Sequence, residues 1–249
     1  MLTFYDSGIG GLTIVNEYLK LRPNAKIQYF ADFDILPMGD KSKEQIFDQI
    51  KCVATKVFKN SNLLVLACNT ASVNTIRELQ QNWLPKHFLG KQILSISKPI
   101  TELLELQYSE FKNQKLVILA TQATINSNFY QQEFENIGFL NVESIPCSGL
   151  CDLIEKLINF ETCTSRFLSQ SQIECNSKKI EGNLVGSLNI ENYLDNLKLP
   201  NDSLILLACT HYPIIKNLFA KVYPSCTIID PSLFIAQKLV EYEFRHPSY

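Results

Sequence analysis

Short apolar runs alternate along this chain with longer segments in which apolar residues recur at helical spacing. This alternation is typical of strand-helix units around a parallel sheet, so the sequence predicts an α/β fold. With 249 residues, the chain is long enough for one large domain or two small ones. The runs that we expect to form strands are Leu2–Tyr5, Lys26–Phe30, Leu63–Ala67, Gln92–Ser95, Lys115–Ala120, Asn141–Ile145, Ser203–Ala208 and Thr227–Ile229.

The segments between these runs predict helices, apart from one stretch that breaks the pattern. Residues 160–189, from Phe160 to Asn189, are polar, rich in Ser and Asn, and weakly periodic. We interpret this stretch as a surface insertion. The expected helices include Gly11–Lys20, Lys43–Lys59, Thr70–Gln80, Pro99–Tyr108 and Thr124–Ile137.

An internal repeat links two distant parts of the chain. Residues Leu63–Thr70 resemble Leu204–His211, because each segment is an apolar strand that ends in Ala-Cys and a small polar residue before a helix. In an open α/β sheet the ligand lies beyond the carboxyl ends of the strands, so two similar halves can present Cys68 and Cys209 to one shared cleft. The alternative is that both are core cysteines, among the most buried residue types. The hydroxyl and amide residues that follow each thiol favour the cleft.

Charge and hydropathy exclude several classes of function. A formal net charge of -2 provides no basic surface for nucleic acid or for an anionic membrane. No apolar run reaches the roughly 18 to 20 residues of a membrane span, and the first residues lack the features of a signal peptide. We therefore expect a cytoplasmic protein that has neither nucleic acid nor a membrane as a partner.

The cysteines constrain the chemistry further. In a reducing compartment, the 8 cysteines are expected to be structural, metal-binding or catalytic. With only 3 histidines in the chain, a zinc site would have to draw on scattered thiols, so the sequence predicts no metal. A thiol redox protein is a further alternative, but Cys68 and Cys209 lack the close Cys-x-x-Cys spacing of such proteins.

Two opposed thiols suit the transfer of a proton across a bound molecule. Racemisation needs a base on one face of the substrate carbon and an acid on the other. A free thiol is mostly protonated at neutral pH, so we expect helix N-termini or a nearby cation to lower the pKa of Cys68 and Cys209. Asp6 and His211 are the expected partners in proton transfer, with a capping or packing role as the alternative for His211. The loop Asp6–Gly11 offers backbone N–H groups to an anion but matches neither a dinucleotide nor a Walker pattern.

Several segments, in one order across nearly the whole chain, carry a resemblance to a known family. They are Asp6–Gly11, Pro37–Gly39, Cys68–Ser72, Ala120–Thr124, Leu153–Glu155 and Cys209–Pro213. Together they make the chain similar to the glutamate racemases of the aspartate/glutamate racemase superfamily. The resemblance implies two similar α/β domains with pseudo-twofold symmetry, a substrate enclosed between them, and no pyridoxal phosphate or metal.

The resemblance also implies a domain division and an activity. Residues 1–95 plus 231–249 would form the half that carries Cys68, and residues 96–230 the half that carries Cys209. The implied activity is the interconversion of L-glutamate and D-glutamate without a cofactor, which supplies D-glutamate for peptidoglycan synthesis. The implied partner is the small-molecule substrate glutamate, and the resemblance allows a homodimer.

Roles for single residues follow from the same resemblance. Cys68 matches the thiolate that removes the α-proton of D-glutamate, and Cys209 matches the one that acts on L-glutamate. Asp6, Glu155 and His211 match the acidic residues and the histidine of the catalytic site. The positions that match substrate-binding residues are Ser7, Pro37, Met38, Gly39, Asn69, Thr70, Thr121, Thr124 and Thr210.

Three departures from the family pattern keep alternatives open. Met38 stands where the family usually has tyrosine, and the segment Ala31–Leu36 also differs from the usual pattern. The sequence ends at Tyr249, soon after the helix expected beyond Asp230, and we expect this to alter a dimer interface or domain closure. The first alternative is an aspartate or broad-specificity racemase, which would keep both cysteines. The second is a non-catalytic binding protein on the racemase fold, which would be expected to lose a thiol or a supporting acid or histidine.

Overall fold

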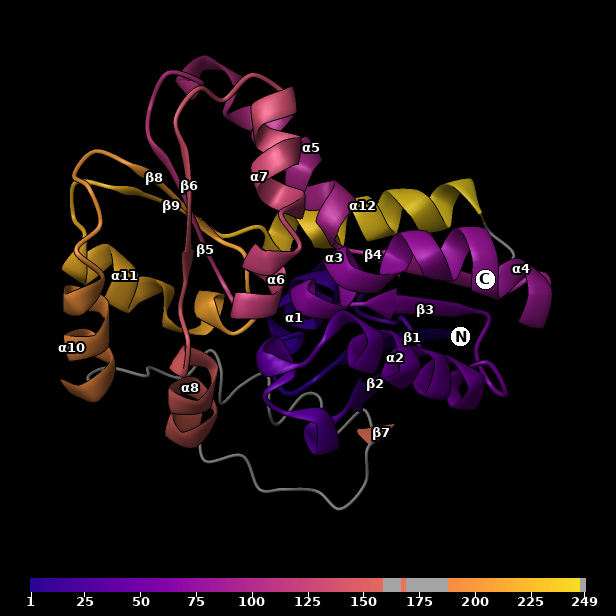
Figure 1. Ribbon diagram of the computed structural model, residues 1–249. Coiled ribbons are helices and arrows are strands. Elements are labelled where there is room, and N and C mark those ends of the chain that lie inside the picture. Colours follow the sequence, from indigo (N-terminus) through magenta and orange to yellow (C-terminus); the bar gives the residue numbers. More distant parts are fainter. Residues whose placement is uncertain (159–166, 169–187, 247–249) are drawn as a thin grey trace.

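A computed structural model of the chain describes residues 1–158, 167–168 and 188–246 (Figure 1). The strands are β1 (Leu2–Asp6), β2 (Ile27–Ala31), β3 (Leu63–Leu66), β4 (Gln92–Ser95), β5 (Leu116–Ala120), β6 (Val142–Pro146), β7 (Phe167–Leu168), β8 (Leu204–Leu207) and β9 (Thr227–Ile229). They form two sheets with helices around them, in the orders β4-β3-β1-β2-β7 and β6-β5-β8-β9. Apart from β7, which is antiparallel to β2, all pairings are parallel. The α/β fold class with two parallel sheets is therefore confirmed.

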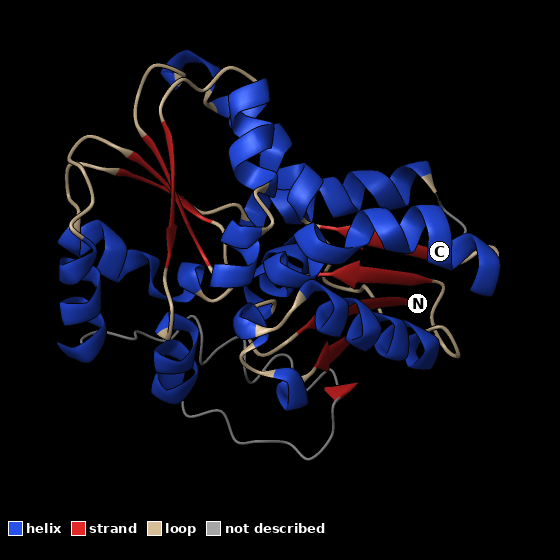
Figure 2. Ribbon diagram, in the orientation of Figure 1, coloured by secondary structure: helices blue, strands red, loops and turns tan. Residues whose placement is uncertain are grey.

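Helices occupy most of the chain between the strands (Figure 2). They are α1 (Leu12–Leu21), α2 (Lys43–Val57), α3 (Asn69–Glu78), α4 (Leu84–His87), α5 (Ser97–Gln107), α6 (Gln122–Asn126), α7 (Phe129–Asn136), α8 (Leu150–Ile158), α10 (Leu188–Leu197), α11 (Lys216–Val222) and α12 (Ser232–Arg245). Short 3-10 helices occur at Phe33–Ile35, Met38–Asp40, Ser109–Phe111 and Tyr212–Ile215. No helix in the described part of the chain combines the length and the apolar character that crossing a bilayer requires.

The two sheets repeat one arrangement of strands. The order β4-β3-β1-β2 in the first sheet corresponds to β9-β8-β5-β6 in the second. The backbone continues the match beyond the strands, because the N–H of Ala67 donates to Tyr5 O at 2.8 Å and the N–H of Ala208 donates to Leu119 O at 2.9 Å. The residue after each of these alanines is a cysteine, so Cys68 and Cys209 occupy equivalent positions in the two sheets.

The first sheet is buried on both faces, which explains its nearly continuous apolar strands. Alternate side chains point to opposite faces of a strand. Tyr5 and Leu64 belong to a core cluster that includes side chains of α2, whereas Phe4 and Val65 belong to a second cluster that includes side chains of α1. Parallel sheets covered by helices on both faces have this pattern.

The last helix returns to the first half of the molecule. Although α12 follows β9 of the second sheet, it packs against α1 and α5. The Tyr18 hydroxyl donates to Glu243 Oε1 at 2.8 Å, and Lys238 Nζ lies 3.3 Å from Glu102 Oε2. The contact with α1 places α12 beside the half that carries Cys68, whereas α5 and Glu102 belong to the predicted range 96–230, so the domain division stays a prediction.

One predicted helix, Thr124–Ile137, is wrong, since the structure has α6 and α7 in its place. The Thr121 side chain accepts a hydrogen bond from the Thr124 N–H at 3.4 Å, so α6 begins at Gln122. The chain then bends at Asn128, whose φ of 55° lies in the left-handed region that asparagine tolerates.

Most of the predicted surface insertion at residues 160–189 lies outside the described residues. Two of its residues, Phe167 and Leu168, form β7 at the edge of the first sheet, and its last two belong to α10. The expectation of a surface insertion for the remainder stays a prediction.

We expect the core of the second sheet to be sensitive to loss of volume. Leu206 lies in β8 between β5 and β9 and is fully buried. Leu206→Ala should lower the free energy of unfolding by about 2–5 kcal/mol, because it removes buried methyl groups and leaves a cavity. Leu140→Ala is the matched control, since Leu140 is 79% exposed, and we expect a change within about 0.5 kcal/mol. Equal midpoints of urea unfolding for the two variants would contradict the burial of β8.

Candidate active site

One cavity lies beyond the carboxyl ends of strands from both sheets, where an α/β fold places its ligands. Its empty volume, including space open to solvent, is about 670 Å³. Of the predicted site residues, those that line it are Ser7, Pro37, Met38, Gly39, Cys68, Asn69, Thr70, Thr121, Cys209, Thr210 and His211. The other three predicted residues do not line the cavity but hydrogen-bond to residues that do. Asp6 bonds to Thr210, Glu155 to His211 and Thr124 to Thr70.

Cys68 lies at the junction of β3 and α3. Its carbonyl accepts the first α-helical hydrogen bond, from the Ser72 N–H at 2.9 Å. Its sulfur lies 3.7 Å from both Ser7 Oγ and Met38 Sδ. Burial, with a further contribution from the charge of Asp6, raises the pKa of the Cys68 thiol to about 12, and the backbone N–H of Ala71 does not offset this. The predicted lowering of this pKa is therefore wrong.

Cys209 departs from its counterpart in the turn that follows it. An α-helical hydrogen bond to Cys209 O would come from residue 213, but Pro213 has no N–H. The Tyr212 N–H donates instead, at 3.1 Å, and a 3-10 helix precedes α11. Burial raises the pKa of the Cys209 thiol well above its usual value. The predictions of an α-helical N-terminus directly after Cys209 and of a lowered thiol pKa are both wrong.

His211 connects Cys209 to an acidic residue of α8. Its Nδ1 lies 3.9 Å from Cys209 Sγ, and its Nε2 lies 2.7 Å from Glu155 Oε1. The same Glu155 oxygen accepts from the Ile9 N–H at 3.0 Å. Burial opposes a charged imidazole, but the hydrogen bonds with Cys209 and Glu155 and their negative charge outweigh it, so the pKa of His211 is raised well above its usual value. Its side chain makes no capping hydrogen bond to the 3-10 helix that follows.

Asp6 is directed toward the second cysteine motif. It is fully buried at the end of β1, and its two oxygens accept from the Gly8 N–H at 2.8 Å and from the Thr210 hydroxyl at 2.9 Å. Burial raises the pKa of this carboxyl. Its hydrogen bond joins Asp6 to the residue after Cys209, while its charge also acts on the Cys68 thiol.

The glycines of the loop after β1 allow the two halves to approach closely. A Cβ on Gly8 would lie 2.2 Å from Glu155 Oε1, and a Cβ on Gly10 would lie 2.6 Å from both Thr210 Oγ1 and His211 Nδ1. Glu155 and His211 are held by hydrogen bonds, so they have little freedom to move away. Glycine is therefore required here for contact between chain segments.

Hydroxyl groups from both halves meet at another wall of the cavity. Thr70 Oγ1, at the start of α3, lies 2.8 Å from Thr121 Oγ1 and 3.3 Å from Thr124 Oγ1. Next to Thr70, Asn69 accepts a hydrogen bond from the Tyr130 hydroxyl at 2.5 Å. These bonds orient the donors at the junction of α3 with α6.

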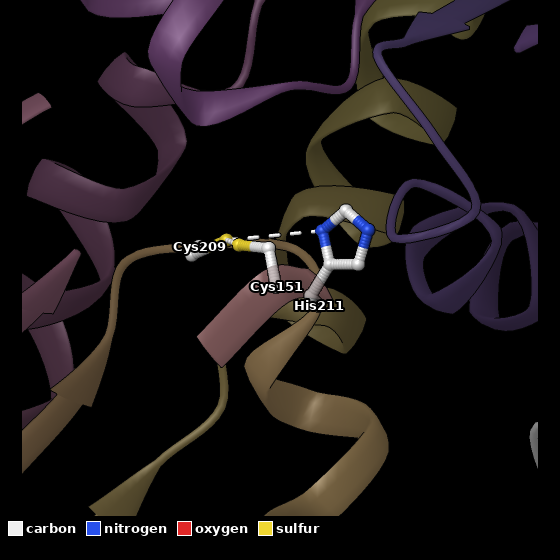
Figure 3. A group of neighbouring side chains, drawn as sticks. All are labelled: Cys151, Cys209 and His211. Atoms are coloured by element: carbon white, nitrogen blue, oxygen red, sulfur yellow. Dashed lines mark hydrogen bonds between the residues drawn. The ribbon is translucent and has the colours of Figure 1, made fainter. Parts of the chain in front are cut away.

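Sequence reasoning missed residues of α8 and of the turn before it. Cys147, Ser148, Cys151 and Asp152 also line the cavity. The Cys151 and Cys209 sulfurs are 3.5 Å apart, with His211 beside them (Figure 3). Cys151 precedes Glu155 by four residues, so the two share one face of a helix, and this spacing was the available signal. Cys151, Cys209 and His211 are also a group within the described residues whose ligand atoms lie close enough to hold a metal ion.

Comparison with known proteins identifies the family of this chain. A scan against protein-family models gave no match. Among curated proteins, a glutamate racemase of Persephonella marina is 31% identical over 230 residues, which cover 92% of this chain and 76% of the relative. The chain belongs to the glutamate racemase family.

Other glutamate racemases cover nearly the whole chain. The enzyme of Cereibacter sphaeroides is 28% identical over 257 residues, covering 98% of this chain and 85% of its own length. The crystal structure of glutamate racemase from Francisella tularensis in complex with D-glutamate matches with a TM-score of 0.74 at 26% identity, and covers 99% of this chain and 81% of that one. The predicted family is therefore confirmed.

The raised pKa of Cys68 predicts slow alkylation at neutral pH. Only the thiolate reacts with iodoacetamide, and its fraction grows about tenfold per pH unit below the pKa. The rate at Cys68, followed by mass spectrometry of its peptide, should keep rising at this slope from pH ~7 to ~10. A plateau of the alkylation rate near pH 9, the ordinary pKa of a thiol, would show that burial does not raise the pKa of Cys68.

Proposed function

We propose that the protein interconverts L-glutamate and D-glutamate without a cofactor, with Cys68 and Cys209 as its two proton-transfer groups. The observation that carries this proposal is that the two thiols, at equivalent positions of two similar sheets, line one cavity. Membership of the glutamate racemase family supplies the reaction and the substrate.

The proposed reaction keeps protons in balance. In the D to L direction, the Cys68 thiolate takes the α-proton, and the Cys209 thiol delivers its own proton to the opposite face of the carbanion. Cys68 is then protonated and Cys209 is a thiolate, which is the state needed for the reverse direction. A protonated His211, 3.9 Å from the Cys209 sulfur, stabilises the thiolate formed there. Glu155 positions His211 through their 2.7 Å contact.

The cavity offers neutral donors to the two carboxylates of glutamate. Among the described residues that line it, none is Lys or Arg. The proposed donors are Ser7, Asn69, Thr70, Thr121 and Thr210, with backbone N–H groups near Gly39. Such donors gain strength where water is excluded. We propose that Asp6 orients Thr210, that Thr124 orients Thr70 and Thr121, and that Pro37 and Met38 complete the wall.

The proposed cellular role is to supply D-glutamate for peptidoglycan synthesis in the cytoplasm. The support for this role is the family to which the chain belongs. A homodimer is the proposed assembly, and light scattering of the purified protein measures it directly.

The substrate is tested first, by circular dichroism of chelator-treated protein with L-glutamate and with L-aspartate, without added cofactor. We expect loss of signal with glutamate alone. Met38 makes aspartate the second candidate, because this buried side chain touches the Cys68 sulfur where the family pattern has tyrosine. Loss of signal with aspartate alone would replace glutamate by this candidate, and no loss with either would contradict a racemase of these substrates.

Both thiols are required for the proposed mechanism. Cys68→Ser and Cys209→Ser should each lower kcat by about 10²–10⁴-fold in both directions, since a hydroxyl is a much weaker acid than a thiol. Cys52→Ser, at an exposed position on α2, is the control. Near-normal turnover by either cavity variant would overturn the two-base assignment.

His211→Asn should slow proton removal from L-glutamate more than from D-glutamate, because His211 faces Cys209. Since racemisation has an equilibrium constant of one, kcat/KM must stay equal in the two directions. The asymmetry therefore appears in kcat and in the primary deuterium isotope effect. We expect kcat from L to D to fall about 10²-fold, with a larger isotope effect for α-deuterated L-glutamate. Equal changes with both enantiomers would remove the special role of His211 toward Cys209.

A further inference from the structure

A group of soft ligand atoms lies at one side of the cavity. The Cys151 and Cys209 sulfurs are 3.5 Å apart, and His211 Nδ1 is 3.9 Å from the Cys209 sulfur (Figure 3). All three residues offer ligand atoms within 4.8 Å of one another. In a tetrahedral zinc site, ordinary bond lengths separate two sulfurs by about 3.8 Å and a sulfur from a nitrogen by about 3.6 Å. The two measured spacings differ from these values by only a few tenths of an ångström.

We propose that Cys151, Cys209 and His211 form a binding site for Zn²⁺, which blocks the thiol that the reaction needs. Two thiolates and one imidazole are a typical zinc ligand set, and three protein ligands leave a fourth position for water. All three residues line the cavity, so the ion reaches them through the same opening as the substrate.

The surroundings of His211 hold it as a metal ligand. Its Nε2 contacts Glu155 at 2.7 Å, and Glu155 is fixed in turn by the Ile9 N–H at 3.0 Å. A ring nitrogen bonded to a carboxylate directs the other nitrogen, here Nδ1, toward the metal, which is the common carboxylate–histidine–zinc arrangement. Cys151 and Glu155 are both on α8, so a single helix supplies one ligand and the carboxylate that orients another.

Metal binding exchanges protons for the ion. The two S–H bonds break, two S–Zn bonds form, and both thiol protons pass to solvent together with any proton on His211 Nδ1. No oxidant is needed. Because Cys209 cannot exchange protons while its sulfur is bound to zinc, the ion should inhibit racemisation. This inhibition rests on the proposed function, whereas the binding of the metal does not.

Metal binding is tested with Co²⁺ as a spectroscopic probe of the full-length, chelator-treated chain in a non-thiol reductant. Co²⁺ should give sulfur-to-metal charge-transfer bands, and Zn²⁺ should displace it. Cys151→Val should weaken the charge transfer and lower the affinity for Zn²⁺ by at least tenfold, since even residues that only orient ligands contribute about 10–100-fold. If the valine variant unfolds, Cys151→Ser is used instead, because serine is closer in size to cysteine.

Two matched variants show whether the effect belongs to the assigned thiol. Cys147→Val removes a buried thiol from the same cavity, and Cys52→Val removes an exposed thiol on α2. Both should keep the cobalt spectrum and the Zn²⁺ affinity. An unchanged spectrum in Cys151→Val, or an equal loss in Cys147→Val, would overturn the assignment.

Activity provides a separate readout. Zn²⁺ should inhibit glutamate racemisation, a chelator should restore it, and Cys151→Val should need at least tenfold more Zn²⁺ for the same fractional inhibition. If the chain proves inactive with glutamate, the cobalt spectra still decide the metal site. Inhibition at the same Zn²⁺ concentration in the Cys151→Val variant would overturn the proposed block.

Discussion

The close contact between the loop after β1 and the Glu155–His211 pair determines the arrangement of the cavity. Glu155 accepts from the backbone of Ile9 in the first half and lies against His211 in the second, so one carboxylate joins the two halves beside Cys209. The approach is close enough that Gly8 and Gly10 tolerate no side chain. Asp6 adds a second link through Thr210. The glycine loop therefore connects the ends of the two sheets at the cavity.

Burial of the ionisable groups around the cavity has an electrostatic cost. Desolvation raises the pKa of Cys68, Cys209 and the Asp6 carboxyl, so each of these groups resists ionisation where it stands. A bound amino acid would bring a cationic ammonium group into the same space, and such a charge favours a thiolate. None of the described residues that line the cavity is Lys or Arg, so the ammonium group of the substrate can supply the positive charge that activates Cys68 as a base.

Most of the architecture could be predicted from local patterns in the sequence. Buried parallel strands give continuous apolar runs, so the fully buried strands β3 and β8 lie within the predicted ranges Leu63–Ala67 and Ser203–Ala208. The strand-end cysteines likewise indicated one shared cavity. Asn128 and Pro213 changed local geometry through one backbone angle and one missing N–H, which periodicity does not report. The thiol pKa values could not be predicted, because desolvation depends on what the whole fold packs around a group.

The equivalence of the two cysteines has a consequence for how the molecule distinguishes mirror images. A catalyst whose product is the mirror image of its substrate could be built from two identical halves, and here Ala67 and Ala208 make matching backbone bonds directly before each thiol. The halves differ immediately afterwards, where Cys68 enters an α-helix and Cys209 enters a 3-10 turn beside His211 and Cys151. A twofold rotation does not turn one enantiomer into the other, so L- and D-glutamate would form different complexes even between equivalent thiols, and these few side chains add a chemical difference between the two proton transfers.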